Sequence, residues 1–146
     1  MTLATDRVFI SIVEEPINWM SFHHQLEDPD VGAHGWFSGV TRRKTGDRIT
    51  ESLSYQAHRP MAVLELRRLA NEAMARFELT RLLIVHRLGV VPIGEPSVVI
   101  GCSSAHRKQA FAALPWLMDQ IKEDVPIWKK EIYLDGTTEW IHPTNQ

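Results

Sequence analysis

The sequence predicts an α+β fold, built as a single domain of residues 1–146. Three observations favour this class. Short segments rich in β-branched residues mix with two long helical patterns, tight turns separate several neighbouring strands, and the order lacks strict strand–helix–strand repetition. A chain of 146 residues matches the usual size of one domain and can bury about two-thirds of its unfolded surface.

The start of the chain predicts a strand followed by a short helix. Val8 to Val13 (VFISIV) is rich in β-branched residues, and Pro16 ends this strand. Asn18 is a favourable N-cap for a helix that continues through Leu26. The turn-rich segment 27–32 (EDPDVG) then forms a loop.

Two strands and a polar tip are expected next. Ala33 to Arg42 forms the first strand, and its internal glycines suggest bulges or the close approach of another backbone. Residues 44–47 (KTGD) form the tip, and Arg48 to Ala57 returns as the second strand. Its alternation places three residues on one face, Ile49, Leu53 and Tyr55.

A long helix and two apolar strands occupy the middle of the chain. Met61 to Phe77 shows helical periodicity, and Pro60 suits the first turn of this helix. Arg81 to Val91 and Pro96 to Cys102 are strongly apolar strands separated by a Pro/Gly turn (PIGEP). The stripe that the helix packs on the sheet is Leu66, Ala70, Ala73 and Phe77.

A second long helix follows, and Ser103 or Ser104 is expected to cap it. Pro115 falls inside this helix and should kink it or split it in two. The predicted core stripe is Phe111, Leu114, Met118 and Ile121.

The chain is expected to close with a hairpin. Glu131 to Leu134 and Glu139 to His142 form its two short strands, around the turn at Asp135-Gly136.

Composition indicates a soluble cytoplasmic protein. The net charge of −2 argues against a nonspecific nucleic-acid coat, and no segment approaches the roughly 20 apolar residues of a membrane span. The single cysteine, Cys102, cannot form an intramolecular disulfide, and the N-terminus lacks the basic start of a signal peptide. The seven histidines do not show metal-ligand spacing, so we predict neither a metal nor a cofactor.

The junction VVIGCSSAHRKQAFAAL predicts an anion site. His106, Arg107 and Lys108 fill the first turn of the expected helix, where cations oppose the helix dipole at a cost of a few tenths to about 1 kcal/mol each. Free amides, serine hydroxyls and cationic side chains together suit a phosphate group. The alternative is that His106 and Arg107 pair with acids elsewhere. Cys102 is interpreted as a small buried hydrophobe rather than as a nucleophile.

The segment GWFSGVTRRK offers an aromatic and cationic combination. Trp36 and Phe37 alternate across a strand, and Arg42 and Arg43 follow at its end. Aromatic rings near arginines suit a flat heterocycle that carries a phosphate, although an aromatic residue in a strand more often belongs to the core.

The segment IKEDVPIWKKE carries two lysines, Lys122 and Lys129, around an apolar Val125-Pro126-Ile127-Trp128 unit. A lysine at a helix C-terminus is favourable for the dipole, which gives Lys122 a structural explanation. A lysine held among other cations can instead have a lowered pKa and act as a base or nucleophile. We expect the apolar unit to direct both lysines into one cavity.

Taken in order, GWFSGVTR, IVHRLG, SSAHR followed by a helix, and IKEDVPIWKKE resemble the large catalytic subunit of molybdopterin synthase, the MoaE family. The matching run spans roughly Gly32 to Trp140. The resemblance implies a sulfurtransferase of molybdenum cofactor biosynthesis that converts cyclic pyranopterin monophosphate (precursor Z) into molybdopterin by installing two dithiolene sulfurs.

The resemblance also implies partners and a fold. Sulfur would arrive as the C-terminal Gly-Gly thiocarboxylate of a small ubiquitin-like, MoaD-like subunit. Two large subunits would form a homodimer with one small subunit at each outer end, a heterotetramer. The fold would be an α/β hammerhead with an antiparallel subdomain. Because the sequence ends Thr144-Asn145-Gln146 rather than Gly-Gly, a separate sulfur carrier is expected.

Site residues follow from the matching motifs. Lys122 and Lys129 correspond to the family's catalytic lysines, with Lys122 the first choice for direct chemistry. The substrate-binding residues implied by the resemblance are Phe37, Arg42, His106 and Arg107, the last two supplied across the dimer interface. The competing hypotheses are a non-catalytic module that binds a phosphorylated ligand or nucleic acid through the same cationic loops, and a scaffold that has lost turnover.

Overall fold

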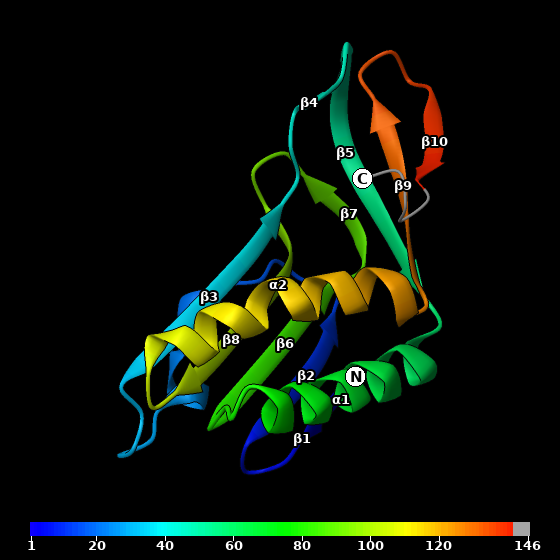
Figure 1. Cartoon of the computed structure of the whole chain (residues 1–146). Coiled ribbons are helices and arrows are strands. Elements are labelled where there is room, and N and C mark those ends of the chain that lie inside the picture. Colours follow the sequence, from blue (N-terminus) through cyan, green and yellow to red (C-terminus); the bar gives the residue numbers. More distant parts are fainter. Residues whose placement is uncertain (142–146) are drawn as a thin grey trace.

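The computed structural model describes residues 1–141, which form two β-sheets with two long helices (Figure 1). In chain order the elements are β1 (Thr2–Ala4), β2 (Val8–Val13), η1 (Trp19–Leu26), β3 (Ala33–Val40), β4 (Lys44–Thr45), β5 (Arg48–Ala57), α1 (Arg59–Arg76), β6 (Arg81–Arg87), β7 (Gly89–Pro92), β8 (Pro96–Ser104), α2 (Arg107–Asp124), β9 (Ile127–Tyr133) and β10 (Thr138–Ile141). No helix in this part of the chain has the apolar length that crossing a bilayer demands.

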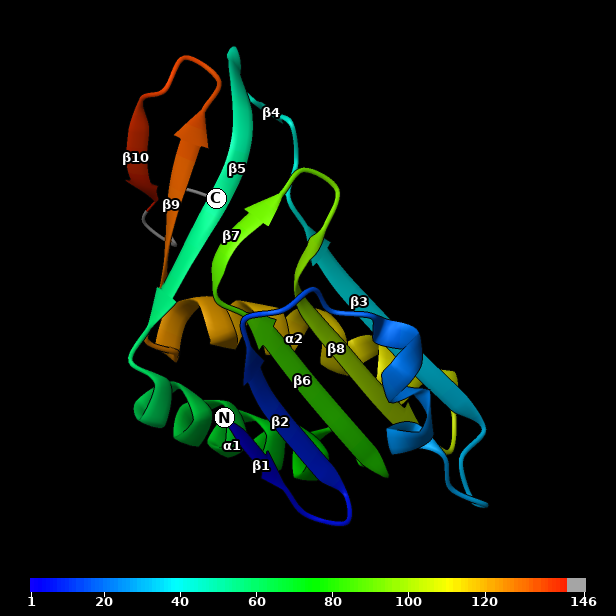
Figure 2. The same ribbon diagram turned by 180° about the vertical axis from the view of Figure 1, so that it is seen from behind.

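The first sheet has the order β1-β2-β6-β8-β3, with β2 and β6 parallel and the other neighbours antiparallel. Helices α1 and α2 cover one face, and the short 3-10 helix η1 covers part of the other, as Figure 2 shows from behind. Because β6 and β8 are covered on both sides, they are buried along almost their whole length. The main core lies between this sheet and the helices and includes Ile10, Leu66, Ile84 and Leu117.

The second sheet is antiparallel, with the order β10-β9-β5-β4. Strand β7 also pairs with β5, on the side opposite β9. It stands at one end of the first sheet (Figure 1). This arrangement confirms the predicted α+β class with an additional antiparallel sheet. The predicted strands Val8–Val13 and Arg48–Ala57 coincide with β2 and β5.

The predicted strand Arg81–Val91 is wrong as one element. The chain forms β6 in the first sheet, turns at Leu88-Gly89, and continues as β7 in the second sheet. Gly89 has φ +84°, a conformation that side chains disfavour, and the Leu88 amide donates to the Val13 carbonyl, which holds the turn. One apolar segment therefore links the two sheets.

The beginning of α2 also differs from the prediction. Ser103 and Ser104 remain in β8, and the helix begins at Arg107 after His106, whose side chain makes no capping hydrogen bond. The Ser104 hydroxyl donates instead to the His106 carbonyl. The predicted serine cap is wrong because the strand continues to Ser104 in register with β3.

Helix α2 runs without interruption from Arg107 to Asp124 although Pro115 lies inside it, so the predicted split is wrong. The predicted core stripe is partly wrong. Phe111 is 60% exposed, and the small residues Ala110 and Ala113 are fully buried in its place. A Cβ on Gly35 of β3 would lie 3.3 Å from the Ala110 Cβ, so the helix backbone packs close to this strand.

The structure also differs from two smaller predictions. Leu53 and Tyr55 of β5 face inward, but Ile49 is 36% exposed because the β5–β9 register shifts between Thr50 and Ser52. The final hairpin forms around Gly136 at φ +87°, and its first strand begins earlier than predicted, at Ile127. The predicted last strand residue, His142, lies outside the described residues.

The Gly32→Ala variant tests the close packing at the entry to α2. A Cβ at position 32 would lie 2.4 Å from the Ala105 carbonyl oxygen, while the Gly32 amide donates to the Ser104 carbonyl at 3.0 Å. We expect the substitution to lower the free energy of unfolding by about 1–3 kcal/mol in urea denaturation, because backbone atoms must move apart. Asp30→Ala, at an exposed position of the same loop, is the control and should be close to neutral. Equal stability of the two variants would contradict this packing.

Candidate active site

A cavity of about 710 Å³ lies between the end of the first sheet, the C-terminal half of α2 and one face of the second sheet. We call it the inter-sheet cavity. Its walls come from β3, β4, β5, β6, β8, α2, β9 and β10, so segments far apart in the sequence meet there. Its ionisable lining residues are Arg42, Tyr55, His86, Lys122, Lys129, Glu131, Tyr133 and Glu139.

Local periodicity directs the two lysines into this cavity. Met118 and Lys122 both line it, because residues four apart lie on the same face of a helix. Lys129, Glu131 and Tyr133 line it from β9, because alternate residues of a strand share a face. Across the sheet, Lys129 pairs directly with Tyr55, which also faces the cavity.

The link between α2 and β9 fixes both lysines. Val125 is 6% exposed and its amide closes the helix on the Ile121 carbonyl. The Pro126 carbonyl accepts from the His58 amide at the beginning of α1. The expectation that this apolar unit brings Lys122 and Lys129 to one cavity is confirmed for their placement.

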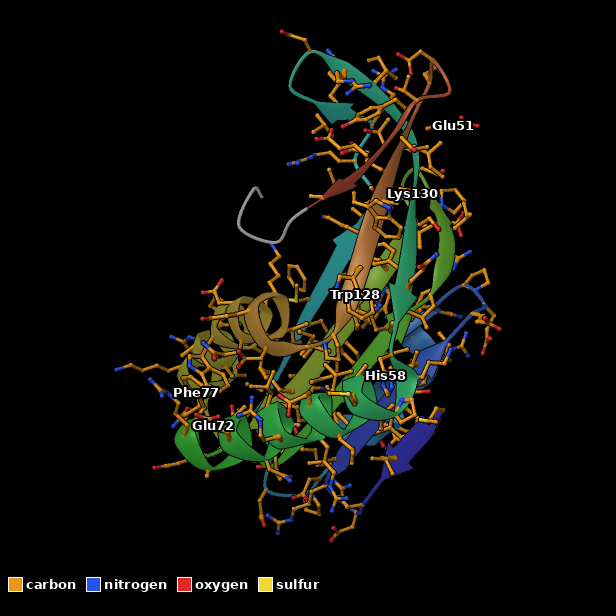
Figure 3. All side chains as sticks on the ribbon, turned by 90° about the vertical axis from the view of Figure 1, so that its right-hand side faces the viewer. Glu51, His58, Glu72, Phe77, Trp128 and Lys130 are labelled. Atoms are coloured by element: carbon orange, nitrogen blue, oxygen red, sulfur yellow. The ribbon has the colours of Figure 1, made fainter. Side chains whose placement is uncertain are left out.

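Trp128 behaves differently from the rest of the unit. It is 51% exposed on the opposite face of β9, as alternation after Ile127 requires. Lys130 lies on that same face with its Nζ 5.7 Å from the centre of the Trp140 ring. Figure 3 labels both Trp128 and Lys130 on β9. Of the neighbouring lysines 129 and 130, the first lines the cavity and the second does not.

Lys129 is the electrostatically strained group of the cavity. The pKa of Lys129 is lowered to about 8, chiefly by burial and then by the positive charges of Lys122 and Arg42, while Glu131 acts in the opposite direction. A lysine with this pKa exists in both protonation states near neutral pH, which suits proton transfer or nucleophilic attack.

Glu131 is a buried carboxylate on the same face of β9 as Lys129. It is 4% exposed, and its carboxylate accepts hydrogen bonds from the hydroxyls of Thr45, Thr50 and Tyr133. Burial alone raises the pKa of this carboxyl, but these hydrogen bonds and Lys129 lower it overall. Glu131 therefore stays ionised and partly offsets the cationic side chains around it.

Phe37 and Arg42 also line the inter-sheet cavity, Phe37 from the second half of β3 and Arg42 from just beyond its end. The structure thus brings four of the residues nominated from the sequence into one cavity: Phe37, Arg42, Lys122 and Lys129. Their roles remain predictions.

His106 and Arg107 do not line this cavity. Both are exposed at the beginning of α2, whereas Lys122 lies in its last turn. The fifteen-residue separation from Arg107 to Lys122 corresponds to about 22 Å along the helix axis. Within one chain, the predicted phosphate pair and the lysine pair are therefore separate.

Cys102 is fully buried, and its thiol donates to the Ala110 carbonyl at 3.4 Å. Burial raises the pKa of this thiol to about 12, so it stays protonated. These properties agree with the interpretation of Cys102 as a small core residue.

The sequence reasoning missed Glu131 and His86 in the cavity. Glu131 could have been found from the Lys129–Glu131–Tyr133 alternation, had the strand been predicted to begin at Ile127 instead of Glu131. His86 belongs to the family motif IVHRLG but received no role, because the division of its apolar segment into β6 and β7 is visible only in the structure.

Comparison with known proteins decides the family. The family model described as MoaE protein matches residues 12–124 of this chain. The chain belongs to the MoaE family. It is similar to the molybdopterin synthase catalytic subunit of Aspergillus oryzae, with 39% identity over 140 residues, covering 96% of this chain and 78% of that protein.

Solved structures of MoaE-type chains agree with this fold. The crystal structure of molybdopterin synthase from Staphylococcus aureus matches with a TM-score of 0.84 and 38% identity, covering 89% of this chain and 94% of that one. This match confirms the fold expected from the family resemblance. A complex of subunits 1 and 2 of the molybdopterin-converting factor from Helicobacter pylori shares the fold, with a TM-score of 0.72, 20% identity, and coverage of 91% and 88%.

The pKa of Lys129 gives a direct test of the cavity's electrostatics. The Lys122→Ala variant removes a positive charge that disfavours the ammonium form, so the pKa of Lys129 should rise from about 8. The measurement is an NMR titration of the Lys129 side chain. Lys108→Ala, at the opposite end of α2, should leave the titration unchanged. A Lys129 pKa that does not respond to removal of Lys122 would contradict the shared cavity.

Proposed function

We propose that this chain is the catalytic subunit of a molybdopterin synthase and converts precursor Z into molybdopterin in the inter-sheet cavity. Family membership makes the chain an enzyme of the sulfurtransferase class, involved in molybdenum cofactor biosynthesis. The observation that carries the site assignment is the convergence of Lys122 and Lys129 on one cavity, with the pKa of Lys129 lowered to about 8.

The charges in the cavity suit this chemistry. Precursor Z carries a phosphate, and the incoming sulfur donor is a thiocarboxylate anion. Arg42, Lys122 and Lys129 line the cavity and can stabilise both anions without reorganising. Lys122 is proposed to act at the junction of thiocarboxylate and substrate, and Lys129 to assist through proton transfer. Phe37 supplies an aromatic wall for the pterin ring.

A small ubiquitin-like subunit is the proposed sulfur carrier, and its Gly-Gly thiocarboxylate tail would enter the inter-sheet cavity. The Helicobacter pylori chain that shares this fold was solved in complex with subunit 1 of its molybdopterin-converting factor. The cavity volume of about 710 Å³ leaves room for a narrow peptide end together with a ligand.

A homodimer is proposed to complete the site. His106 and Arg107 are too far along α2 to serve the cavity of their own chain, so their predicted role in phosphate binding requires a second copy. The full assembly would be a heterotetramer of two large and two small subunits, as the resemblance implies.

The Lys122→Ala variant tests the catalytic assignment. With thiocarboxylated small subunit and precursor Z, we expect molybdopterin formation to fall by at least about 100-fold, because a positioned catalytic group is lost. Binding of the small subunit, measured by calorimetry, should be largely retained. Lys130→Ala is the control, since its side chain lies on the other face of β9 over Trp140.

Near wild-type turnover of Lys122→Ala would remove Lys122 from the catalytic role. A wild-type chain that binds precursor Z but forms no dithiolene product, under conditions that support a known synthase, would instead favour a non-catalytic binding module.

Mixing two inactive variants tests the shared site. Lys122→Ala and Arg107→Ala chains, unfolded together and refolded at equal amounts, should recover about a quarter of wild-type activity, because half of the dimers then hold one intact site. Each variant refolded alone should remain near its own low activity. Recovery no greater than the sum of the two variants alone would show that each chain uses its own Arg107.

A further inference from the structure

His86 is a buried titratable group that the proposed chemistry does not use. It lies near the end of β6, is 6% exposed, and lines the inter-sheet cavity beside Tyr55. The two rings meet edge to face, with centroids 5.1 Å apart and an interplanar angle of 68°. Strand β6 pairs with β2 on one side and with β8 on the other, which fixes the backbone at His86. The ring itself is held by the Tyr55 contact and by a hydrogen bond to the Arg87 carbonyl.

The hydrogen bond at one ring nitrogen decides the state of the other. His86 Nδ1 lies 3.0 Å from the Arg87 carbonyl oxygen. A carbonyl oxygen only accepts, so Nδ1 must carry the proton and donate it. In the neutral ring Nε2 then holds a lone pair and can only accept.

The surroundings keep the ring neutral. The pKa of His86 is lowered to about 4, chiefly by burial and also by the positive charge of Lys129, against the opposing effect of the hydrogen bond to Arg87. Arg42 and Lys122 add further positive charge to the same cavity, and the Glu131 carboxylate is held by three hydroxyl groups. Nε2 is therefore unprotonated throughout the physiological pH range.

This nitrogen is also uncommitted. Within residues 1–141, Nε2 accepts no hydrogen bond. It is also not one of the unpartnered side-chain atoms that are closed off from solvent, so it remains accessible. The carboxylates that line the cavity, Glu131 and Glu139, both lie within hydrogen-bonding distance of the Tyr133 hydroxyl, at 3.3 and 2.9 Å. The cavity thus offers cations for the anionic part of a ligand and one rigid neutral acceptor for a donor group.

We propose that His86 determines which ligand the cavity accepts: its unprotonated Nε2 receives an N–H or O–H of the pterin ring, while Arg42 and the lysines hold the anionic groups. The inference rests on the proposed function, because a reduced pterin supplies ring N–H donors that a simple phosphate ester lacks. A ligand without a donor at this position leaves a lone pair facing the cavity unmatched, and binding weakens accordingly.

Two substitutions separate the two nitrogens of His86. The amide nitrogen of His86→Asn reaches the position of Nδ1 and keeps the hydrogen bond to Arg87, but the acceptor at Nε2 is gone. The amide oxygen of His86→Gln reaches the position of Nε2 and restores an acceptor, while the bond to Arg87 is lost. A merely structural role requires the Arg87 bond and favours Asn over Gln.

Steady-state kinetics with precursor Z and the thiocarboxylated small subunit measure the difference. We expect His86→Asn to raise KM for precursor Z about tenfold with kcat within about threefold of wild type, as loss of one ligand hydrogen bond predicts. His86→Gln should recover most of that affinity. His24→Asn, at an exposed position of η1, controls for the histidine-to-amide change itself. An unchanged KM in His86→Asn, or a Gln variant as impaired as Asn, overturns the proposal.

Nitrogen NMR of the wild-type protein gives an answer that requires no variant and no turnover. The His86 ring should show the Nδ1–H tautomer, and its Nε2 resonance should move when precursor Z is added. A moving resonance without product formation would retain the His86 assignment and reject the proposed catalysis. Product formation with an unmoved Nε2 resonance would reject the His86 assignment and retain the catalysis.

Discussion

Repulsion between two ammonium groups held in one cavity is the constraint on which this site depends. Flexible lysines would move apart, so the backbone must hold them together. The helix α2 ends at Asp124, β9 begins at Ile127, and the two residues between them are anchored by burial of Val125 and by the hydrogen bond from His58 to Pro126. The stability of the fold maintains an arrangement of charge that free side chains would avoid. The pKa of Lys129 is lowered chiefly by its burial and, after that, by the positive charge of Lys122.

Compensation for this charge is built into the same sheet. Glu131 follows Lys129 on the same face of β9, and its carboxylate is fixed by hydroxyl groups from Thr45, Thr50 and Tyr133. A fixed carboxylate offsets part of the cationic charge without forming an ion pair that would occupy the lysines. The cavity therefore remains attractive to an anionic ligand while the protein tolerates its own cations.

Sequence reasoning predicted the elements whose signal is local. The β-branched segment of β2, the alternating segment of β5 and the periodic stripe of α1 all form where their patterns indicate. It did not predict the turn at Leu88-Gly89, because both halves of that apolar segment are buried, each in a different sheet. It placed Phe111 in the core because periodicity ranks a large apolar residue above alanine, whereas the close approach of α2 to Gly35 favours the alanines. The family motifs gave a role to Lys122 and Lys129 but none to His86, whose neighbours in the cavity are contributed by other strands.

The walls of the inter-sheet cavity come from strands and a helix distributed between Phe37 and Ile141. No fragment shorter than residues 37–141 contains all of the walls. A protein assembled from exchangeable modules could acquire or lose such a cavity by recombination, but this one can only be inherited whole. Changes to its specificity must therefore arise by substitution at individual wall positions, while the path of the backbone stays the same.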